Sequence, residues 1–234
     1  MVQISQLILG ETGCVSYVIS SKKEAIIVDS FQGFESNIEK ELERLQNPQI
    51  KYVIDTHTHA DRRSASIYFS EKYKTNGIVK SNKTKYKGKI KETNDGDILK
   101  IGTSKLLVIF TPGHTYDHNC YLIDDNILLS GDCLFIGDVG RIDLGGNPKE
   151  KSDLLFNSLR TLEKLSKNTR VYPNHVGAAH AIDSENTYST IGNEIETNEA
   201  MQIKDSDKFY IYMTEGWPPK PDDWEQIIED NLNG

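Results

Sequence analysis

The first part of the chain alternates short runs of aliphatic residues with polar turns. Three such runs predict β-strands, at residues 2–9, 15–19 and 25–29. The period then changes, because Ile38, Leu42 and Leu45 are spaced four and three residues apart. Apolar residues at this spacing share one face of a helix, so residues 35–45 are predicted to form an amphipathic helix.

The middle of the chain returns mostly to strand patterns. Further strands are predicted at residues 52–55, 106–110, 120–123, 127–129 and 170–173. The Asp-Asp-Asn sequence at 124–126 predicts a turn between two of them. One helix is predicted over residues 64–73. Another begins after the cap residue Asn147, has Pro148 at its first position, and is expected to run to about Lys167.

The last part of the chain is more polar. From about residue 185 it is predicted to be helical, with a proline-rich break at residues 217–221. We see no internal repeat and no low-complexity linker, and therefore predict a single domain over residues 1–234 with a helical C-terminal extension. Strands dominate early, and the helices have one apolar face each. This pattern predicts an α+β fold in which two packed sheets are covered by helices.

Composition and charge narrow the class of function. The 234 residues are 37% hydrophobic and 26% charged, which is ordinary for a globular protein. The net charge of -8 argues against a nucleic-acid surface, because phosphate binding needs concentrated Lys and Arg. No apolar run approaches the roughly 18 residues of a membrane span. The N-terminus lacks a charged segment before a hydrophobic stretch, so no signal peptide is expected.

The cysteines and one run of lysines suggest no chemistry by themselves. Cys14, Cys120 and Cys133 include no C-x-x-C pair, which fits a reducing cytoplasm, the expected location. None has a basic neighbour in the sequence, and Cys120 and Cys133 lie among apolar strand residues, which favours core thiols. The lysine-rich stretch 80–91 is predicted to be a solvated loop, with binding of an anionic tail as the alternative.

Histidines and acids follow several predicted strands. Residues 56–62 read T-H-T-H-A-D-R, residues 111–115 read T-P-G-H-T, and residues 130–132 read S-G-D. Neutral imidazole and carboxylate are the usual ligands of a divalent transition metal. In an extended segment His57 and His59 point the same way, although such a pair taken alone also fits surface or core histidines. Together the three segments predict a metalloenzyme.

The order of these motifs carries a family resemblance. T-H-T-H-A-D, T-P-G-H-T and S-G-D, followed by Y-P-N-H at residues 172–175, resemble the metallo-β-lactamase superfamily. The resemblance implies a four-layer αββα sandwich with metal ligands on loops along one sheet edge. Its dinuclear members use H-x-H-x-D-H, where this chain has Arg62 at the last position. A guanidinium stays charged and cannot ligate a metal, so one metal ion is expected, with two metals held by the remaining ligands as the alternative.

Residues 131–144 narrow the resemblance further. They read G-D-C-L-F-I-G-D-V-G-R-I-D-L and closely resemble the persulfide dioxygenases of this superfamily, as does the C-terminal part of the chain. The resemblance implies that His57, His114 and Asp132 are catalytic and hold one Fe(II) per chain. Two histidines and one carboxylate are also the facial triad of non-haem iron oxygenases, which leaves open positions on the metal.

Other polar residues near these motifs receive supporting roles. His59 is either a fourth metal ligand, as in zinc relatives, or a hydrogen-bonding neighbour of the ligands. Asp61 and His175 are expected to contact the ligands or line the substrate pocket once a second metal is absent. Arg141 is expected either to bind a substrate carboxylate or to brace the ligand loop through Asp143.

The resemblance also implies a reaction. The enzyme would oxidise a low-molecular-weight thiol persulfide, typically glutathione persulfide, with O2 to sulfite and the free thiol. The chain shows no rhodanese domain, so a separate sulfurtransferase is expected to supply persulfide, and a homodimer is left open. The alternative is a glyoxalase II-like zinc hydrolase of thiolesters, in which metal-bound hydroxide attacks a carbonyl. That reaction would favour a histidine where Arg62 stands.

Two details depart from the family pattern or match nothing in it. Some dioxygenases carry a tyrosine shortly after Y-P-x-H, where this chain has Val176 and Gly177. His118 and His180 match no ligand position and are predicted to be ordinary histidines.

Overall fold

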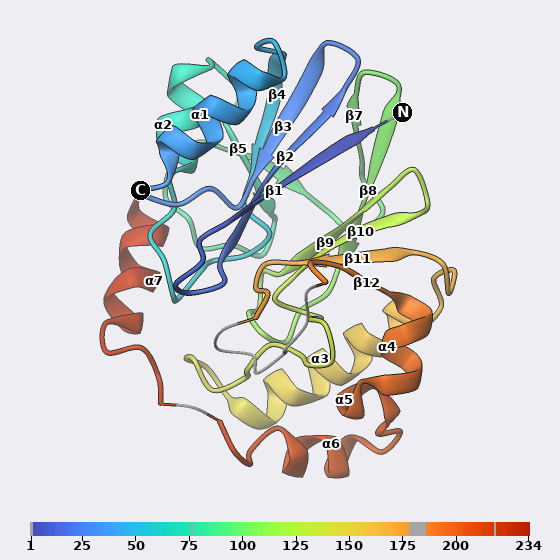
Figure 1. Ribbon diagram of the computed structural model, residues 1–234. Coiled ribbons are helices and arrows are strands. Elements are labelled where there is room, and N and C mark those ends of the chain that lie inside the picture. The colour runs from blue at the N-terminus through green and yellow to red at the C-terminus, as the bar shows by residue number, and fades with distance from the viewer. Residues whose placement is uncertain (1, 76, 178–185, 218) are drawn as a thin grey trace.

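The computed structural model describes residues 2–75, 77–177, 186–217 and 219–234. Within these residues two six-stranded sheets pack face to face (Figure 1). The first sheet has the order β1 (Gln3–Ile8), β2 (Val15–Ser21), β3 (Glu24–Val28), β4 (Gln49–Ile54), β5 (Ile78–Ser81), β6 (Ile90–Thr93). The second has the order β12 (Ser189–Thr190), β11 (Arg170–Pro173), β10 (Ile127–Gly131), β9 (Asn119–Ile123), β8 (Ser104–Phe110), β7 (Ile98–Ile101).

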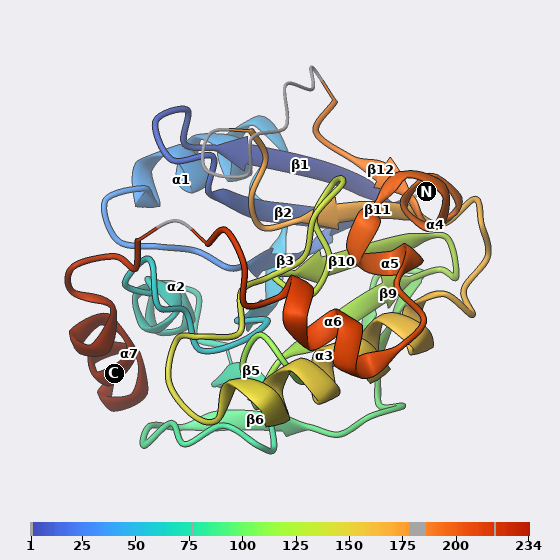
Figure 2. The same cartoon turned by 90° about the horizontal axis from the view of Figure 1, so that it is seen from below.

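Helices cover the outer faces of both sheets (Figures 1 and 2). The first sheet carries α1 (Glu35–Arg44) and α2 (Ser66–Lys72). The second carries α3 (Pro148–Leu162), α4 (Ile191–Thr197), α5 (Glu199–Gln202) and α6 (Ser206–Tyr212). The last helix, α7 (Trp224–Asn233), leaves this group and lies beside α2. The predicted α+β fold with an αββα layer order is therefore confirmed.

Apolar side chains fill the space between each pair of layers. Tyr17, Ile54, Val108 and Tyr121 lie between the two sheets. Other buried groups join the first sheet to α1 and α2, or the second sheet to α3–α6. Complete burial of a large aliphatic side chain stabilises a fold by about 1.5–3 kcal/mol, so these contacts hold the layers together. Every helix in the described part of the chain is too short or too polar to cross a membrane.

Most predicted elements are present with small shifts of their ends. The strand at Arg170–Pro173 has the predicted bounds, and α3 begins after Asn147, whose side chain accepts hydrogen bonds from two backbone amides. That helix ends at Leu162, five residues before its predicted end at Lys167. The turn at 124–126 is also confirmed. Asp124 and Asp125 have positive φ angles of 45° and 59°, as a tight hairpin between two antiparallel strands requires.

The lysine-rich stretch was predicted to be a solvated loop, and this is wrong at both ends. Lys80 belongs to β5, is 4% exposed, and its Nζ lies 2.6 Å from Asp55 Oδ2. The other end enters β6 at Ile90. The lysines between the two strands are exposed as predicted. The sequence analysis did not predict four short strands, β5, β6, β7 and β12. Each is short and contains polar residues, which obscure the apolar pattern of a strand.

Candidate metal centre

The predicted metal-binding motifs meet at one edge of the two sheets. β8, β10 and β11 run in the same direction, so the segments that follow them leave the second sheet at the same edge. The segment after β4 meets them from the first sheet, where Asn119 donates its backbone amide to Thr56 O at 2.8 Å. Because strands of both sheets end here, residues far apart in the sequence form one site.

Three predicted ligands form a compact triad. The ligand atoms of His57, His114 and Asp132 lie within 4.8 Å of one another, and all three side chains are buried. Asp132 Oδ2 lies 3.7 Å from His57 Nε2 and 3.5 Å from His114 Nε2. Two imidazoles and one carboxylate at these distances can converge on a single cation.

Each of the two imidazoles in the triad turns its Nε2 atom toward Asp132 and bonds through its Nδ1 atom on the other side of the ring. His57 Nδ1 lies 2.9 Å from Thr56 Oγ1, and His114 Nδ1 donates to Arg141 O at 2.8 Å. His57 Nε2 is buried and has no hydrogen-bond partner among the described residues. A buried ring nitrogen that nothing satisfies fits a bound metal ion.

The charge states suit the same role. Burial lowers the pKa of His114 to about 4 and holds the pKa of His57 well below its ordinary value. Burial would raise the pKa of Asp132, but the charge of His175 and its hydrogen bond outweigh this and lower it. At neutral pH the triad therefore holds two neutral imidazoles and one carboxylate, which are the protonation states that a metal requires.

A glycine in the predicted dioxygenase-like segment allows this packing. A Cβ atom on Gly140 would lie 1.9 Å from Asp132 O and 2.9 Å from His114 Nδ1. Contacts this short are excluded, so any side chain here would move two members of the triad.

Asp29, which directly follows β3, holds the loop that carries His57 and His59. The sequence analysis did not predict this role. This fully buried carboxylate accepts hydrogen bonds from Thr56 N at 2.8 Å and from Asn174 Nδ2 at 2.9 Å. His59 Nε2 lies 3.0 Å from the same carboxylate. His59 joins neither group of candidate ligands among the described residues, and its Nδ1 faces Asp61 Oδ1 at 3.8 Å.

His118 also has a structural role that motif comparison did not reveal. It is fully buried, and its Nε2 accepts a hydrogen bond from Asp132 N at 3.0 Å. Its Nδ1 lies 2.8 Å from Thr111 Oγ1, on the segment that carries His114. His118 thus ties two ligand loops together. His180 lies outside the described residues.

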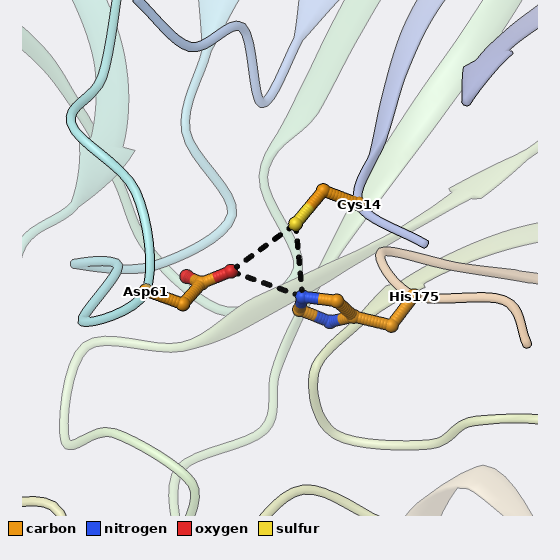
Figure 3. Close-up of side chains that lie close together, drawn as sticks. All are labelled: Cys14, Asp61 and His175. Atoms are coloured by element: carbon orange, nitrogen blue, oxygen red, sulfur yellow. Dashed lines mark hydrogen bonds and ion pairs between the residues drawn. The ribbon is translucent and has the colours of Figure 1, made fainter. Parts of the chain in front are cut away.

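A second cluster lies beside the triad, since His175 Nδ1 lies 3.3 Å from Asp132 Oδ1. Figure 3 shows the side chains of this second cluster. Cys14, Asp61 and His175 also place ligand-type atoms within 4.8 Å of one another. Arg62 lies against this cluster, with Nη1 3.4 Å from Asp61 Oδ2 and 3.5 Å from His175 Nε2. Burial would lower the pKa of Arg62, but Asp61 and other acids outweigh it, so the guanidinium stays charged.

Arg141 forms the pair with Asp143 that one of its two predicted roles requires. Its Nε and Nη2 donate to the two carboxylate oxygens at 2.6 and 2.9 Å. Its guanidinium also lies 5.5 Å from the centre of the Trp217 ring. Since its carbonyl holds His114, the pair braces a ligand of the triad.

A cavity of about 770 Å³ opens over the triad. Its lining includes Cys14, His114, Asp132 and His175, together with Arg141, Tyr212 and Trp217. The last two come from α6 and the segment after it, so the C-terminal part of the chain completes the pocket.

A family model named Metallo-beta-lactamase superfamily matches residues 9–229. The chain belongs to this superfamily. It is thus an enzyme of a metal-dependent family, as the motifs predicted. A hydroxyacylglutathione hydrolase of Dictyostelium discoideum is 28% identical over 211 residues, which are 87% of this chain and 72% of that protein. One from Buchnera aphidicola subsp. Baizongia pistaciae is 31% identical over 159 residues, 68% of this chain and 60% of that protein.

Solved structures of the superfamily share the fold closely. A metallo-beta-lactamase from Staphylococcus aureus subsp. aureus COL superposes with a TM-score of 0.90 at 26% identity, over 100% of this chain and 73% of that chain. ETHE1 from Myxococcus xanthus superposes with a TM-score of 0.83, also at 26% identity, over 98% of this chain and 96% of that chain. The resemblance to the superfamily is confirmed, and the likeness to ETHE1 supports the narrower one.

Proposed function

We propose that this protein is a mononuclear non-haem iron persulfide dioxygenase. It would oxidise a low-molecular-weight thiol persulfide, with glutathione persulfide as the first candidate, to sulfite and the free thiol. The observation that carries the proposal is the buried triad of His57, His114 and Asp132, with the Arg62 guanidinium beside it where dinuclear relatives have a histidine. The likeness to ETHE1, a persulfide dioxygenase, over almost the whole of both chains supports it.

The three side chains fit one iron ion. His57 and His114 would each give a neutral ring nitrogen, and Asp132 would give a carboxylate oxygen. Bound there, iron would supply the electron exchange between sulfur and O2 that spin-paired substrates undergo only slowly. Arg62 opposes a second cation by its charge, and we place His59 outside the coordination shell as a hydrogen-bonding partner of Asp29.

The remaining residues form the substrate pocket. Its volume of about 770 Å³ is within the range of cavities that enclose small-molecule ligands. Asp61 and His175 line the pocket, and we assign to Arg141 the bracing of His114. The relatives named hydroxyacylglutathione hydrolase support a glutathione-type thiol carrier. A cytoplasmic location and a separate sulfurtransferase that supplies persulfide belong to the same proposal.

The second candidate function is zinc-dependent hydrolysis of thiolesters. The observation in its favour is that the relatives in sequence are named hydroxyacylglutathione hydrolase. Against it stands Arg62, because metal-bound hydroxide shared between two zinc ions needs a second set of uncharged or anionic ligands. The Arg62 charge beside the triad opposes a second cation and thereby favours the dioxygenase.

Two assays on one preparation separate these functions. Protein purified without O2 should contain about one iron per chain, should consume O2 with glutathione persulfide, and should not hydrolyse S-lactoylglutathione. Metal-loaded protein that splits the thiolester and consumes no O2 would refute the proposal.

Replacement of one ligand tests the assignment of the triad. Asp132→Ala should abolish iron binding and O2 uptake, because the remaining two imidazoles provide neither the negative charge nor the third ligand. Asp153→Ala, which removes a half-exposed carboxylate of α3, is the matched control and should keep both. Retention of full iron content by Asp132→Ala would show that the metal is held elsewhere.

A further inference from the structure

Cys14 differs from the other two cysteines in its position. Cys14 directly precedes β2, and its side chain lines the same cavity as His114 and Asp132. Cys120 and Cys133 are completely buried and do not line it. Sequence reasoning found no basic neighbour for any cysteine, and for Cys14 the fold provides two, His175 and Arg62.

The backbone holds the Cys14 side chain against His175. The two residues form an isolated antiparallel bridge, flanked by hydrogen bonds from Val15 N to Asn174 O and from Val176 N to Gly13 O. Gly13 makes this close approach practicable: its φ is +72°, and a Cβ atom there would lie 2.3 Å from Val176 O. Cys14 Sγ is therefore placed by main-chain geometry and not by a flexible loop.

The surroundings of the sulfur favour a reactive thiol. Cys14 Sγ lies 3.5 Å from His175 Nε2 and 3.6 Å from Asp61 Oδ2, and the three side chains point toward one another (Figure 3). His175 Nδ1 in turn lies 3.3 Å from Asp132 Oδ1. Burial would raise the pKa of Cys14, but the hydrogen bond with His175 and the charge of Arg62 outweigh it and lower this pKa. A thiol beside an oriented imidazole is the usual arrangement of an activated sulfur nucleophile.

We propose that Cys14 accepts the outer sulfur atom of the substrate persulfide and holds it as a cysteine persulfide at the wall of the metal centre. The Cys14 sulfur attacks the outer sulfur, a new S–S bond forms, and the S–S bond of the substrate breaks. The proton that Cys14 gives up ends on the departing thiolate. The balance is Cys14–SH plus R–S–SH giving Cys14–S–SH plus R–SH, without any oxidant or reductant.

This inference rests on the proposed function for its substrate class. The Arg62 charge opposes a cation held by Cys14, Asp61 and His175. Arg62 Nη1 lies 3.4 Å from Asp61 Oδ2 and 3.5 Å from His175 Nε2. A covalent sulfur adduct needs no such cation and is favoured by the same charge, which stabilises a thiolate.

The test uses the full chain without O2, so that sulfur can be transferred but not oxidised. Wild-type protein and Cys14→Ser are mixed with glutathione persulfide, alkylated, digested and analysed by mass spectrometry. The peptide with Cys14 should gain the mass of one sulfur atom in the wild type, and released glutathione should appear in equal amount. Cys14→Ser should lose both. The peptides of Cys120 and Cys133 are controls within the same digest and should gain little.

The outcomes distinguish this inference from the proposed function. A sulfur adduct on Cys14 without O2 uptake by the iron-loaded enzyme would refute the dioxygenase and leave the sulfur acceptor standing. O2 uptake by Cys14→Ser at the wild-type rate and iron content would refute the acceptor as a step and leave the dioxygenase standing. Equal labelling of all three cysteines, or an equivalent of zinc lost on Cys14→Ser, would also refute the acceptor.

Discussion

At the scale of single residues, Arg62 is the side chain that, under the proposed function, limits the site to one metal ion. Its guanidinium is buried between Asp61 and His175, and its charge is balanced by acids on several sides. A neutral imidazole at the same place would bring a ligand instead of a charge. Under the proposed function the number of metals therefore depends on this one side chain.

Arg62→His is therefore expected to raise the zinc content from about one to about two ions per chain, because it removes the repelling charge and adds a ligand. Elemental analysis after dialysis against zinc measures the change. The neighbouring arginine gives a matched control: Arg63 is partly exposed and pairs with Asp230, so Arg63→His should leave the zinc content unchanged. An unchanged zinc content in Arg62→His would mean that its charge is not what limits the site.

Lys151 is a buried basic residue whose charge, unlike that of Arg62, the fold opposes. It is 1% exposed, and within the described part of the chain its Nζ donates to the carbonyls of Leu144 and Gly145 at 3.1 and 3.3 Å. Burial lowers the pKa of Lys151 from 10.5 to about 8. Between these values the unfolded chain still holds the proton that the folded protein has lost, so this group makes the folded state more stable as pH rises from about 8 to 10.5.

Lys151→Met should remove that pH-dependent gain, which is on the order of 3 kcal/mol for a shift of this size. The variant should also be more stable than wild type at pH 7, where the buried ammonium is charged. Urea denaturation at several pH values measures both effects. The free energies of unfolding of wild type and variant are compared from pH 7 to 10.5. If they differ by a constant amount over this range, the Lys151 ammonium is well solvated in the folded protein.

At the scale of elements, the C-terminal helix α7 holds the metal-binding loop in place. Asn231 Nδ2 donates to His59 O at 3.0 Å and to Arg62 O at 2.8 Å, and its Oδ1 accepts from Ser64 N at 2.7 Å. Both the Nδ2 and the Oδ1 atom of Asn231 therefore bond to a segment that lies 167 to 172 residues earlier in the chain. No metal ligand comes from α7, yet it determines where the loop with His57 and His59 lies.

Asn231→Ala should leave these backbone groups without partners and lower the free energy of unfolding of the metal-free protein by about 1–3 kcal/mol. The apparent affinity for metal should fall as well, because the ligand loop loses its support. Asn233→Ala, at an exposed position of the same helix end, should change stability by less than about 0.5 kcal/mol. Equal effects of the two substitutions would indicate simple loss of helix packing.

At the scale of the whole molecule, the triad joins the two sheets. His57 comes from the end of β4 in the first sheet, whereas His114 and Asp132 follow β8 and β10 in the second. A metal ion bound by all three would link both halves of the sandwich. Binding to the folded state alone stabilises it by mass action, by about 4 kcal/mol when the metal is at 1,000 times its dissociation constant.

Iron or zinc should therefore raise the midpoint of thermal unfolding, and a chelator should reverse the rise. Differential scanning calorimetry of the metal-free and loaded protein measures it. Asp132→Ala should show no difference between the two states. A shift of similar size in that variant would place the stabilising metal outside the triad.

Short motifs in the sequence pointed to three side chains that the fold brings together. His57, His114 and Asp132 each belong to a short motif directly after a predicted strand, and a strand end is a local property. The partners of these ligands could not be predicted in the same way. Asp29 was read as the last residue of a strand, and His118 as an ordinary histidine, because their roles depend on which loops the sheets bring together.

The sequence by itself determined most of the strands and helices, because the hydrophobic period depends on neighbours in the chain. Its short motifs are equally local, and the family resemblance they carry implied the αββα class and the three side chains of the triad. Only the tertiary structure placed Cys14 against His175, 161 residues away, and Lys80 against Asp55 inside the protein. It also brought the α7 end under the metal-binding loop. Such contacts arise when sheets and helices pack, and packing is decided by the fit of whole surfaces that no local pattern encodes.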